Sequence, residues 1–160
     1  MCQENSHKLV LKEPRTVWKV VYFLGGGPHP IYKSIYRDFV YPIGKTVFAE
    51  NTYCYKDTIN ACGCDFDIGS GFLHFFQKYE DAKIFLESQA ERWKILGVPG
   101  NLYGHDKITL TILECELDRG DEVFDGIFRY GIQEIMRKPL STCAFKATVK
   151  SEFKIARTCV

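Results

Sequence analysis

A helical repeat of apolar residues between positions 79 and 96 constrains the fold of this chain more than any other stretch. Apolar side chains recur there at steps of three and four residues, which places them on one face of an α-helix. They are Ala82, Phe85, Leu86, Ala90, Trp93 and Leu96. Glu80 and Asp81 complement the positive end of the helix dipole, and Gly97 followed by Pro99 is typical of a helix end. The pattern predicts an amphipathic helix at about residues 79–96.

Four segments on either side of this helix have the composition or alternation of β-strands. They are residues 16–24, 107–117, 127–136 and 143–155. The first has Lys19 nearly alone as a polar group, which is typical of a strand covered on both faces. The second changes its apolar set from even to odd positions at Leu113, so it is either covered on both sides at first or contains a bulge. The sequence therefore predicts an α+β fold with one mostly antiparallel sheet, continuous or split.

The domain organisation follows from length and composition. A chain of 160 residues has the size of one domain, and 46% hydrophobic with 14% aromatic content excludes intrinsic disorder. Residues 1–15 are polar and end close to Pro14, which predicts a loose N-terminal arm. Residues 16–160 are then expected to form a single α+β domain.

Charge and cysteine content bear on partners and compartment. A formal net charge of +1, with both signs spread along the chain, gives no support for a nucleic-acid partner. The first residues lack the layout of a secretory signal, and the apolar runs are too short to span a bilayer. We therefore expect a cytoplasmic protein without a membrane partner. An odd number of cysteines, seven, is then expected to consist of reduced thiols.

Residue types that carry metal or nucleophilic chemistry are present, but their spacing is not that of a known site. Cys62 and Cys64, with Cys54 nearby, fall short of the paired spacing of structural zinc sites, so we predict no metal site. His74 differs from the other histidines because it lies within the apolar run 72–76. An imidazole there must find a hydrogen-bond partner or face a pocket, and the sequence leaves both alternatives open.

A distant resemblance to a known family covers several of these segments at once. The motif Gly69-x-Gly71-Phe72-x-His74-Phe75, followed by Glu80-Asp81-Ala82-x-x-Phe85, resembles the glycine-led strand and helix of the ADP-ribosyltransferase family. Residues 110–117 are similar to the family's next strand, and residues 18–22 to its first core strand. The glycine-led strand with its histidine also resembles small uncharacterised domains from phages and microbes.

The resemblance implies an α+β fold with a split sheet that clamps NAD. It further implies a cleft around His74, in which His74 holds the ribose and Glu134 stabilises the developing positive charge. The implied cofactor-binding residues are Tyr22, Gly71 and Phe75.

Two functional hypotheses follow. The first is a non-catalytic binding or interaction module, without a cofactor, whose ligand is an unknown small molecule or protein; it is favoured by the missing catalytic set and the near-neutral charge. The second is an NAD-dependent ADP-ribosyltransferase-like enzyme that uses a cleft around His74. A likeness of fold alone gives little weight to an activity, which favours the module.

Overall fold

The computed structural model describes residues 2–25, 28–35, 39–49, 66–67, 72–105, 107–129 and 138–160. One α-helix, α1 (Tyr79–Leu96), and one short 3₁₀ helix, Gly100–Leu102, lie within these segments. The strands are β1 (Cys2–Val10), β2 (Arg15–Leu24), β3 (Lys33–Ser34), β4 (Thr46–Phe48), β5 (Phe66–Asp67), β6 (Leu73–Phe76), β7 (Ile108–Leu117), β8 (Glu122–Arg129), β9 (Leu140–Ala144) and β10 (Lys146–Cys159). Within the described segments no helix is long and apolar enough to cross a membrane.

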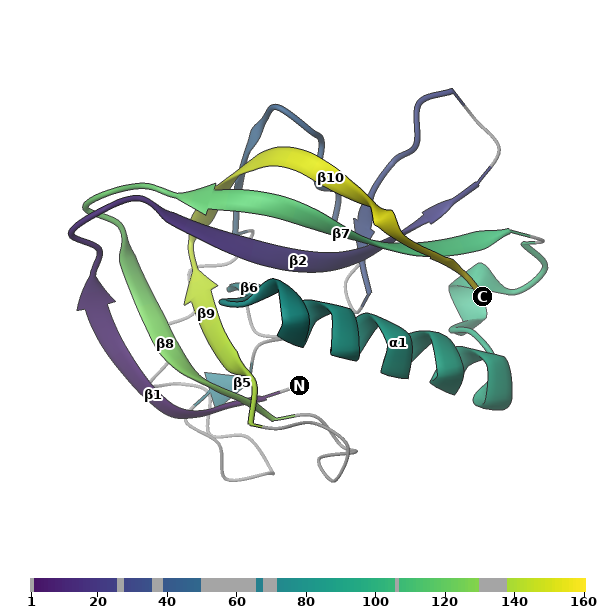
Figure 1. Cartoon of the computed structure of the whole chain (residues 1–160), viewed down its shortest axis with the longest axis horizontal. Coiled ribbons are helices and arrows are strands. Elements are labelled where there is room, and N and C mark those ends of the chain that lie inside the picture. Colours follow the sequence, from purple (N-terminus) through teal and green to yellow (C-terminus); the bar gives the residue numbers. More distant parts are fainter. Residues whose placement is uncertain are drawn as a thin grey trace.

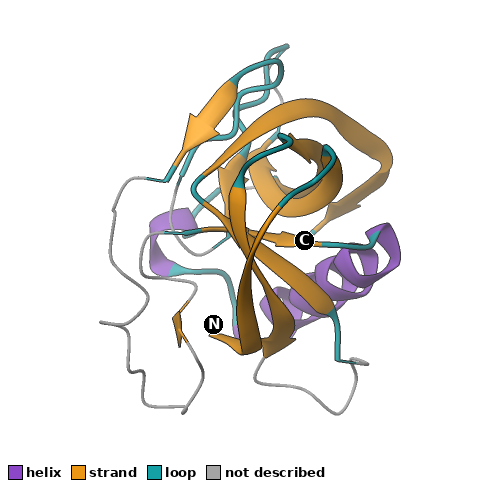
Figure 2. Ribbon diagram, turned by 90° about the vertical axis from the view of Figure 1, so that its left-hand side faces the viewer, coloured by secondary structure: helices purple, strands orange, loops and turns teal. Residues whose placement is uncertain are grey.

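The strands form one curved sheet in the order β4-β10-β7-β2-β6-β9-β8-β1-β5, with β3 paired to β2 (Figures 1 and 2). Every strand pair between described residues is antiparallel. Helix α1 lies against one face of this sheet (Figure 1). The predicted α+β class, the mostly antiparallel sheet and the helix at residues 79–96 are confirmed.

The central pair of the sheet is β2 with β7. Their register runs from Arg15 opposite Leu117 to Leu24 opposite Ile108 without a shift. The first six residues of β7 are all buried, so both faces of that stretch are covered. Of the two alternatives that the sequence leaves open for this strand, coverage on both sides is confirmed. The irregularities lie in β10, whose register with β7 shifts twice.

The sheet consists of two groups of strands, β4-β10-β7-β2 and β6-β9-β8-β1-β5, and the backbone pairing between the groups is short. Strands β2 and β6 share a single residue pair, Trp18 with Phe76, whereas β2 and β7 pair along ten residues. Beyond that pair the Lys19 ammonium donates a hydrogen bond of 2.8 Å to the backbone carbonyl of His74. A side chain of β2 therefore supplies a partner to β6 where the backbone ladder has ended.

Apolar side chains form a core cluster on each face of the sheet. The cluster beneath α1 includes Phe85 and Trp93 from the helix and Ile112 from β7. The cluster on the opposite face includes Val21 from β2 and Phe75 from β6. The alternation of side chains along each strand divides the two sets, because successive residues point to opposite faces.

The N-terminal residues differ from the loose arm predicted for residues 1–15. Strand β1 pairs with β8 from Cys2 opposite Arg129 to Val10 opposite Glu122, with an irregularity between Glu4 and His7. This strand is held by backbone pairing and by a buried polar side chain, Gln3. Neither contribution appears as apolar alternation in the sequence, which is why composition alone indicated an arm.

Two strand boundaries near the C-terminus also differ from the prediction. Residues 143–155 alternate as if they were one strand, but the chain bends at Phe145, between β9 and β10. Strand β9 pairs with β6 and β8, while β10 pairs with β4 and β7. The strand predicted at residues 127–136 begins earlier, at Glu122, and residues 130–137 lie outside the described part of the chain.

Candidate binding site

The side chain of His74, the predicted catalytic residue, lies in the core on the α1 side of the sheet, where it packs against Phe76 and Phe128. Its side chain is buried and its ring stacks on Phe128 with a centroid distance of 4.6 Å. Burial, together with the charge of Lys19, lowers the pKa of His74 well below its usual range, so the imidazole is neutral at pH 7. The His74 Nε2 atom has no hydrogen-bond partner within the described segments.

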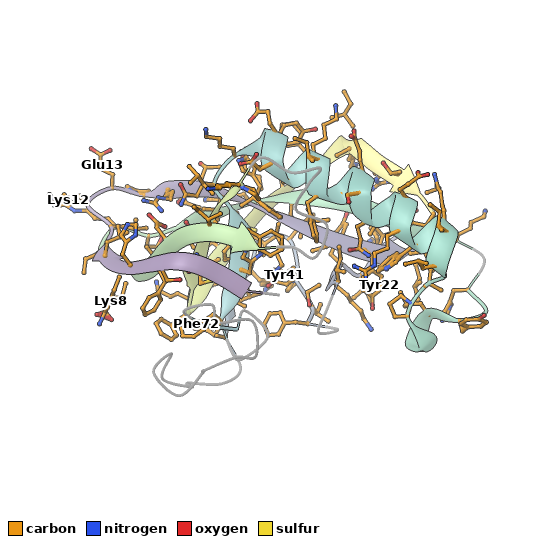
Figure 3. The ribbon with its side chains drawn as sticks, turned by 90° about the horizontal axis from the view of Figure 1, so that it is seen from below. Lys8, Lys12, Glu13, Tyr22, Tyr41 and Phe72 are labelled. Carbon is orange, nitrogen blue, oxygen red and sulfur yellow. The ribbon has the colours of Figure 1, made fainter. Side chains whose placement is uncertain are left out.

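Of the other residues of the predicted NAD site, Tyr22 and Phe75 lie in the described part of the chain, and they point to opposite faces of the sheet. Tyr22 is buried beneath α1, where its ring packs edge-to-face on Trp93, and Phe75 is buried in the cluster on the opposite face. Figure 3 shows Tyr22 at the other end of β2 from the turn that bears Lys12. Gly71 and Glu134, as well as Cys62 and Cys64, lie outside the described residues.

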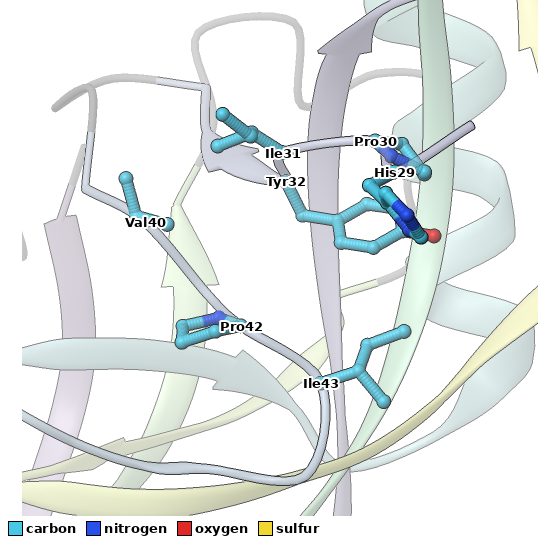
Figure 4. Close-up of a pocket in the computed structure, with 7 residues that line it drawn as sticks. All are labelled: His29, Pro30, Ile31, Tyr32, Val40, Pro42 and Ile43. Atoms are coloured by element: carbon cyan, nitrogen blue, oxygen red, sulfur yellow. The ribbon is translucent and has the colours of Figure 1, made fainter. Parts of the chain in front are cut away.

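An open hollow occurs elsewhere, where two short segments meet beside β3 (Figure 4). Its volume is about 300 Å³. The residues that line it are His29, Pro30, Ile31, Tyr32, Val40, Pro42 and Ile43. Ile31 is 61% exposed, Val40 42% and Ile43 43%, so three large apolar side chains face water around one depression. The described residues contain no group of three side chains placed to hold a metal ion.

The two segments that form the hollow are fixed to each other and to the sheet. The Tyr41 amide donates to the Tyr32 carbonyl over 2.9 Å, and the Gly44 amide donates to the Val149 carbonyl of β10 over 2.8 Å. Pro30 and Pro42 restrict the backbone further, because the ring of proline fixes φ. The hollow is therefore preformed in the free protein.

Tyr32 connects the floor of the hollow to a buried carboxylate. Its hydroxyl donates to Glu152 Oε1 over 2.5 Å, and the Glu152 carboxylate also accepts from Thr111 Oγ1 at 2.7 Å and from Arg157 Nε at 2.6 Å. Only 1% of the Glu152 side chain is exposed. Desolvation opposes the ionisation of Glu152, but the hydrogen bonds from Arg157, Tyr32 and Thr111 outweigh it and lower its pKa to about 2. Burial and Glu152 raise the pKa of Tyr32 to about 12.

No protein-family model, curated protein or solved structure matches the chain. The resemblance to ADP-ribosyltransferases therefore stays a prediction.

The Glu152 carboxylate also accepts hydrogen bonds across a bulge in β10. Phe153 pairs with Ile112 and Thr158 with Leu110, so residues 154–157 of β10 lie opposite Thr111 alone. Arg157 reaches back from the end of the bulge to Glu152. A bulge of this size interrupts pairing at the sheet edge, which protects the edge against association with other strands.

Sequence reasoning missed the hollow because its parts are short. Ile31, Val40 and Ile43 are apolar residues in segments rich in turn formers, where neither a helical nor a strand period is present to indicate a site. Apolar residues that no strand or helix pattern explains, placed next to prolines, were the available signal.

We expect Glu152→Gln to lower the free energy of unfolding at pH 7 by about 2 kcal/mol, since hydrogen bonds to a charged group contribute about 1.5–3 kcal/mol. The stabilisation by the carboxylate is complete above the ordinary glutamate pKa of 4.5 and is lost as the pH falls towards 2. Urea unfolding from pH 7 to pH 2.5 should show the difference from wild type shrinking below about pH 4.5. A pH-independent difference would contradict this account. Glu116→Gln, which removes an exposed pair with Lys150, is the control.

Proposed function

We propose that this protein is a non-catalytic binding module that takes an apolar group of its ligand into the hollow. The observation that carries the proposal is the convergence of Ile31, Val40 and Ile43, all exposed, on one depression. Single exposed apolar side chains are normal on protein surfaces, but side chains grouped around a concavity mark interaction sites. Burying their apolar area against a ligand is favourable, at roughly 25 cal/mol per Å².

The rigidity of the hollow supports binding rather than mere exposure. The hydrogen bond from Tyr41 to Tyr32 joins its two walls, and those from Gly44 and from the Tyr32 hydroxyl hold the walls on β10 before any ligand arrives. A preformed site loses little conformational entropy on binding, so more of the apolar contact appears as affinity.

We expect the fluorescent probe 1-anilinonaphthalene-8-sulfonate to bind the native protein saturably, because its rings are apolar and the hollow is open. Ile43→Asp should weaken this binding about tenfold or more, since it places a charge where apolar contact is needed. Ile95→Asp is the matched control: Ile95 is 71% exposed and lies near the end of α1, in a different part of the fold. Equal weakening by both substitutions, or none by Ile43→Asp, would refute the proposal. Near-UV circular dichroism verifies that each variant is folded.

A thermal-shift series with NAD and ADP-ribose addresses the enzyme hypothesis in the same samples. A ligand that binds only the folded state raises the unfolding temperature. On the proposal made here, neither compound shifts the transition at millimolar concentration. A shift that His74→Ala abolishes, in a variant that still folds, would support the NAD-dependent alternative instead.

A further inference from the structure

Ile155 is the most exposed large apolar side chain of the described residues, with 87% of its surface open to water. It lies in the β10 bulge, residues 154–157, and is called the knob below. Two hydrogen bonds from Arg157 to Glu152 close the bulge at its base. A single exposed isoleucine is ordinary, so the importance of the knob depends on what lies beside it.

The knob lies beside the hollow, because both ends of the bulge are connected to Tyr32, which lines the hollow. At one end Glu152 accepts the hydrogen bond from the Tyr32 hydroxyl. At the other end Arg157 lies over the ring of Phe23 at 5.0 Å, and that ring packs edge-to-face on Tyr32 with a centroid distance of 5.6 Å. An exposed apolar knob and an apolar hollow are therefore neighbours at one edge of the sheet.

On the basis of the proposed function, we infer that the apolar group that enters the hollow is Ile155 of a second copy of this chain. A knob and a hollow side by side are complementary to themselves when two copies meet around a two-fold axis, because each copy then inserts its knob into the hollow of the other. The product is a closed dimer with two identical contacts. Hydrogen bonds hold both the bulge and the hollow before contact, so association orders few further groups.

The apolar area available is that of a weak dimer. Ile155 is 87% exposed, Ile31 61%, Ile43 43% and Val40 42%. A fully exposed side chain of this size presents about 130 Å², at roughly 0.8 kcal/mol per carbon and 25 cal/mol per Å². The four side chains then offer roughly 300 Å² per copy and about 600 Å² in the dimer. Because a little more than half of an interface is apolar, the whole contact is about 1,000 Å², near the lower limit for specific interfaces.

Sedimentation velocity from micromolar to millimolar protein concentration tests the inference. We expect wild type to change from monomer to dimer and to form nothing larger. Ile155→Asp and Ile43→Asp should each raise the dissociation constant about tenfold or more, since each places a carboxylate against apolar side chains. Ile155→Leu should keep the dimer, and Ile95→Asp, near the end of α1, is the matched control that should also keep it. Near-UV circular dichroism verifies that each variant is folded.

A mixture of the two aspartate variants gives a sharper test. The Ile155→Asp chain keeps a normal hollow and the Ile43→Asp chain keeps a normal knob, so a mixed pair has one intact contact, whereas a pair of identical variant chains has none. The mixture should therefore dimerise more strongly than either variant alone and more weakly than wild type. A mixture that associates no more strongly than its components would overturn the inference.

The remaining outcomes separate this inference from the proposed function. If the naphthalene probe binds at Ile43 while the protein stays monomeric at millimolar concentration, the dimer is overturned and the binding module stands. A dimer that Ile155→Asp leaves intact uses another surface, which also overturns the inference. Growth beyond the dimer would mean that knob and hollow meet head to tail, which overturns the two-fold arrangement. If the probe does not bind and the protein stays monomeric, both proposals fail.

Discussion

A chain that lacks residues 1–9 is expected to lose most of its stability and its cooperative unfolding transition. Strand β1 covers the outer side of β8 along nearly its whole length. Gln3 is fully buried, and its side-chain amide donates to the Phe124 carbonyl at 3.0 Å and to Ser141 Oγ at 2.7 Å. Truncation would leave these oxygens without their partner and would expose the edge of β8. Each buried polar group left unsatisfied costs about 1–3 kcal/mol, against a total stability of about 5–15 kcal/mol for a typical domain.

Urea unfolding followed by far-UV circular dichroism measures this effect. We expect the truncated chain to unfold at a much lower urea concentration, or without a transition. Gln3→Ala alone should cost about 2 kcal/mol, because it removes the hydrogen bonds and keeps the strand. Lys8→Gln is the control: it removes an exposed ion pair with Glu122, and such pairs contribute about 1 kcal/mol or less. An unchanged midpoint after truncation would mean that β1 contributes nothing to the fold.

The second large effect has the opposite sign: Lys19→Met is expected to stabilise the protein at pH 7. The Lys19 ammonium lies in the core beside the rings of Tyr41 and Phe75, and the hydrogen-bond acceptor that it reaches is the carbonyl of His74. Burial lowers its pKa from 10.5 to about 8, against the opposing influence of the Cys115 and Cys143 thiols. This change corresponds to roughly 3 kcal/mol of unfavourable free energy. Loss of a hydrogen bond from a charged group costs about 1.5–3 kcal/mol, so the net gain is at most about 2 kcal/mol.

The pH dependence distinguishes this effect from better packing. Between about pH 8 and 10.5 the native state has lost the Lys19 proton while the unfolded chain still binds it, so wild type gains stability relative to Lys19→Met as the pH rises. The buried thiols destabilise both proteins at alkaline pH, since burial raises the pKa of Cys115 to about 12. Their contribution cancels in the comparison. Guanidinium unfolding at pH 7 and pH 10 checks the prediction. A variant that is less stable than wild type at pH 7 would contradict it, and so would a difference in the free energy of unfolding that is the same at both pH values.

The elements predicted from sequence are those whose stability comes from their own apolar pattern. Helix α1 buries one face, and β2 and β7 are covered on both faces, so the local sequence of each contains the signal. Strand β1 has no such signal, because its buried side chain is a glutamine whose partners lie on β8 and β9. The bend at Phe145 was missed because the apolar alternation on either side of it continues.

The candidate site was less predictable for a related reason. Tyr32 and Glu152 are 120 positions apart in the sequence, and Lys19 and the His74 carbonyl are 55 apart. No short segment of the sequence contains both members of such a pair, so a local pattern cannot indicate that they are in contact. The resemblance to ADP-ribosyltransferases rests on local spacing around Gly71, and local spacing does not reveal that Tyr22 and Phe75 point to opposite faces of the sheet.

The strands with which β1 and β2 pair determine when this protein can fold during its synthesis, because both partners come much later in the sequence. Strand β2 is the centre of the sheet, but its long partner β7 begins at Ile108, and the partner of β1 begins at Glu122. Both strands therefore leave the ribosome well before the residues that cover them. Until β7 has been synthesised, the apolar residues of β2 lack the strand that pairs with them in the folded protein, and exposed apolar segments of this kind are prone to aggregation. Slowing translation within the first hundred or so residues should prolong this exposed state, whereas slowing it after β8 should not.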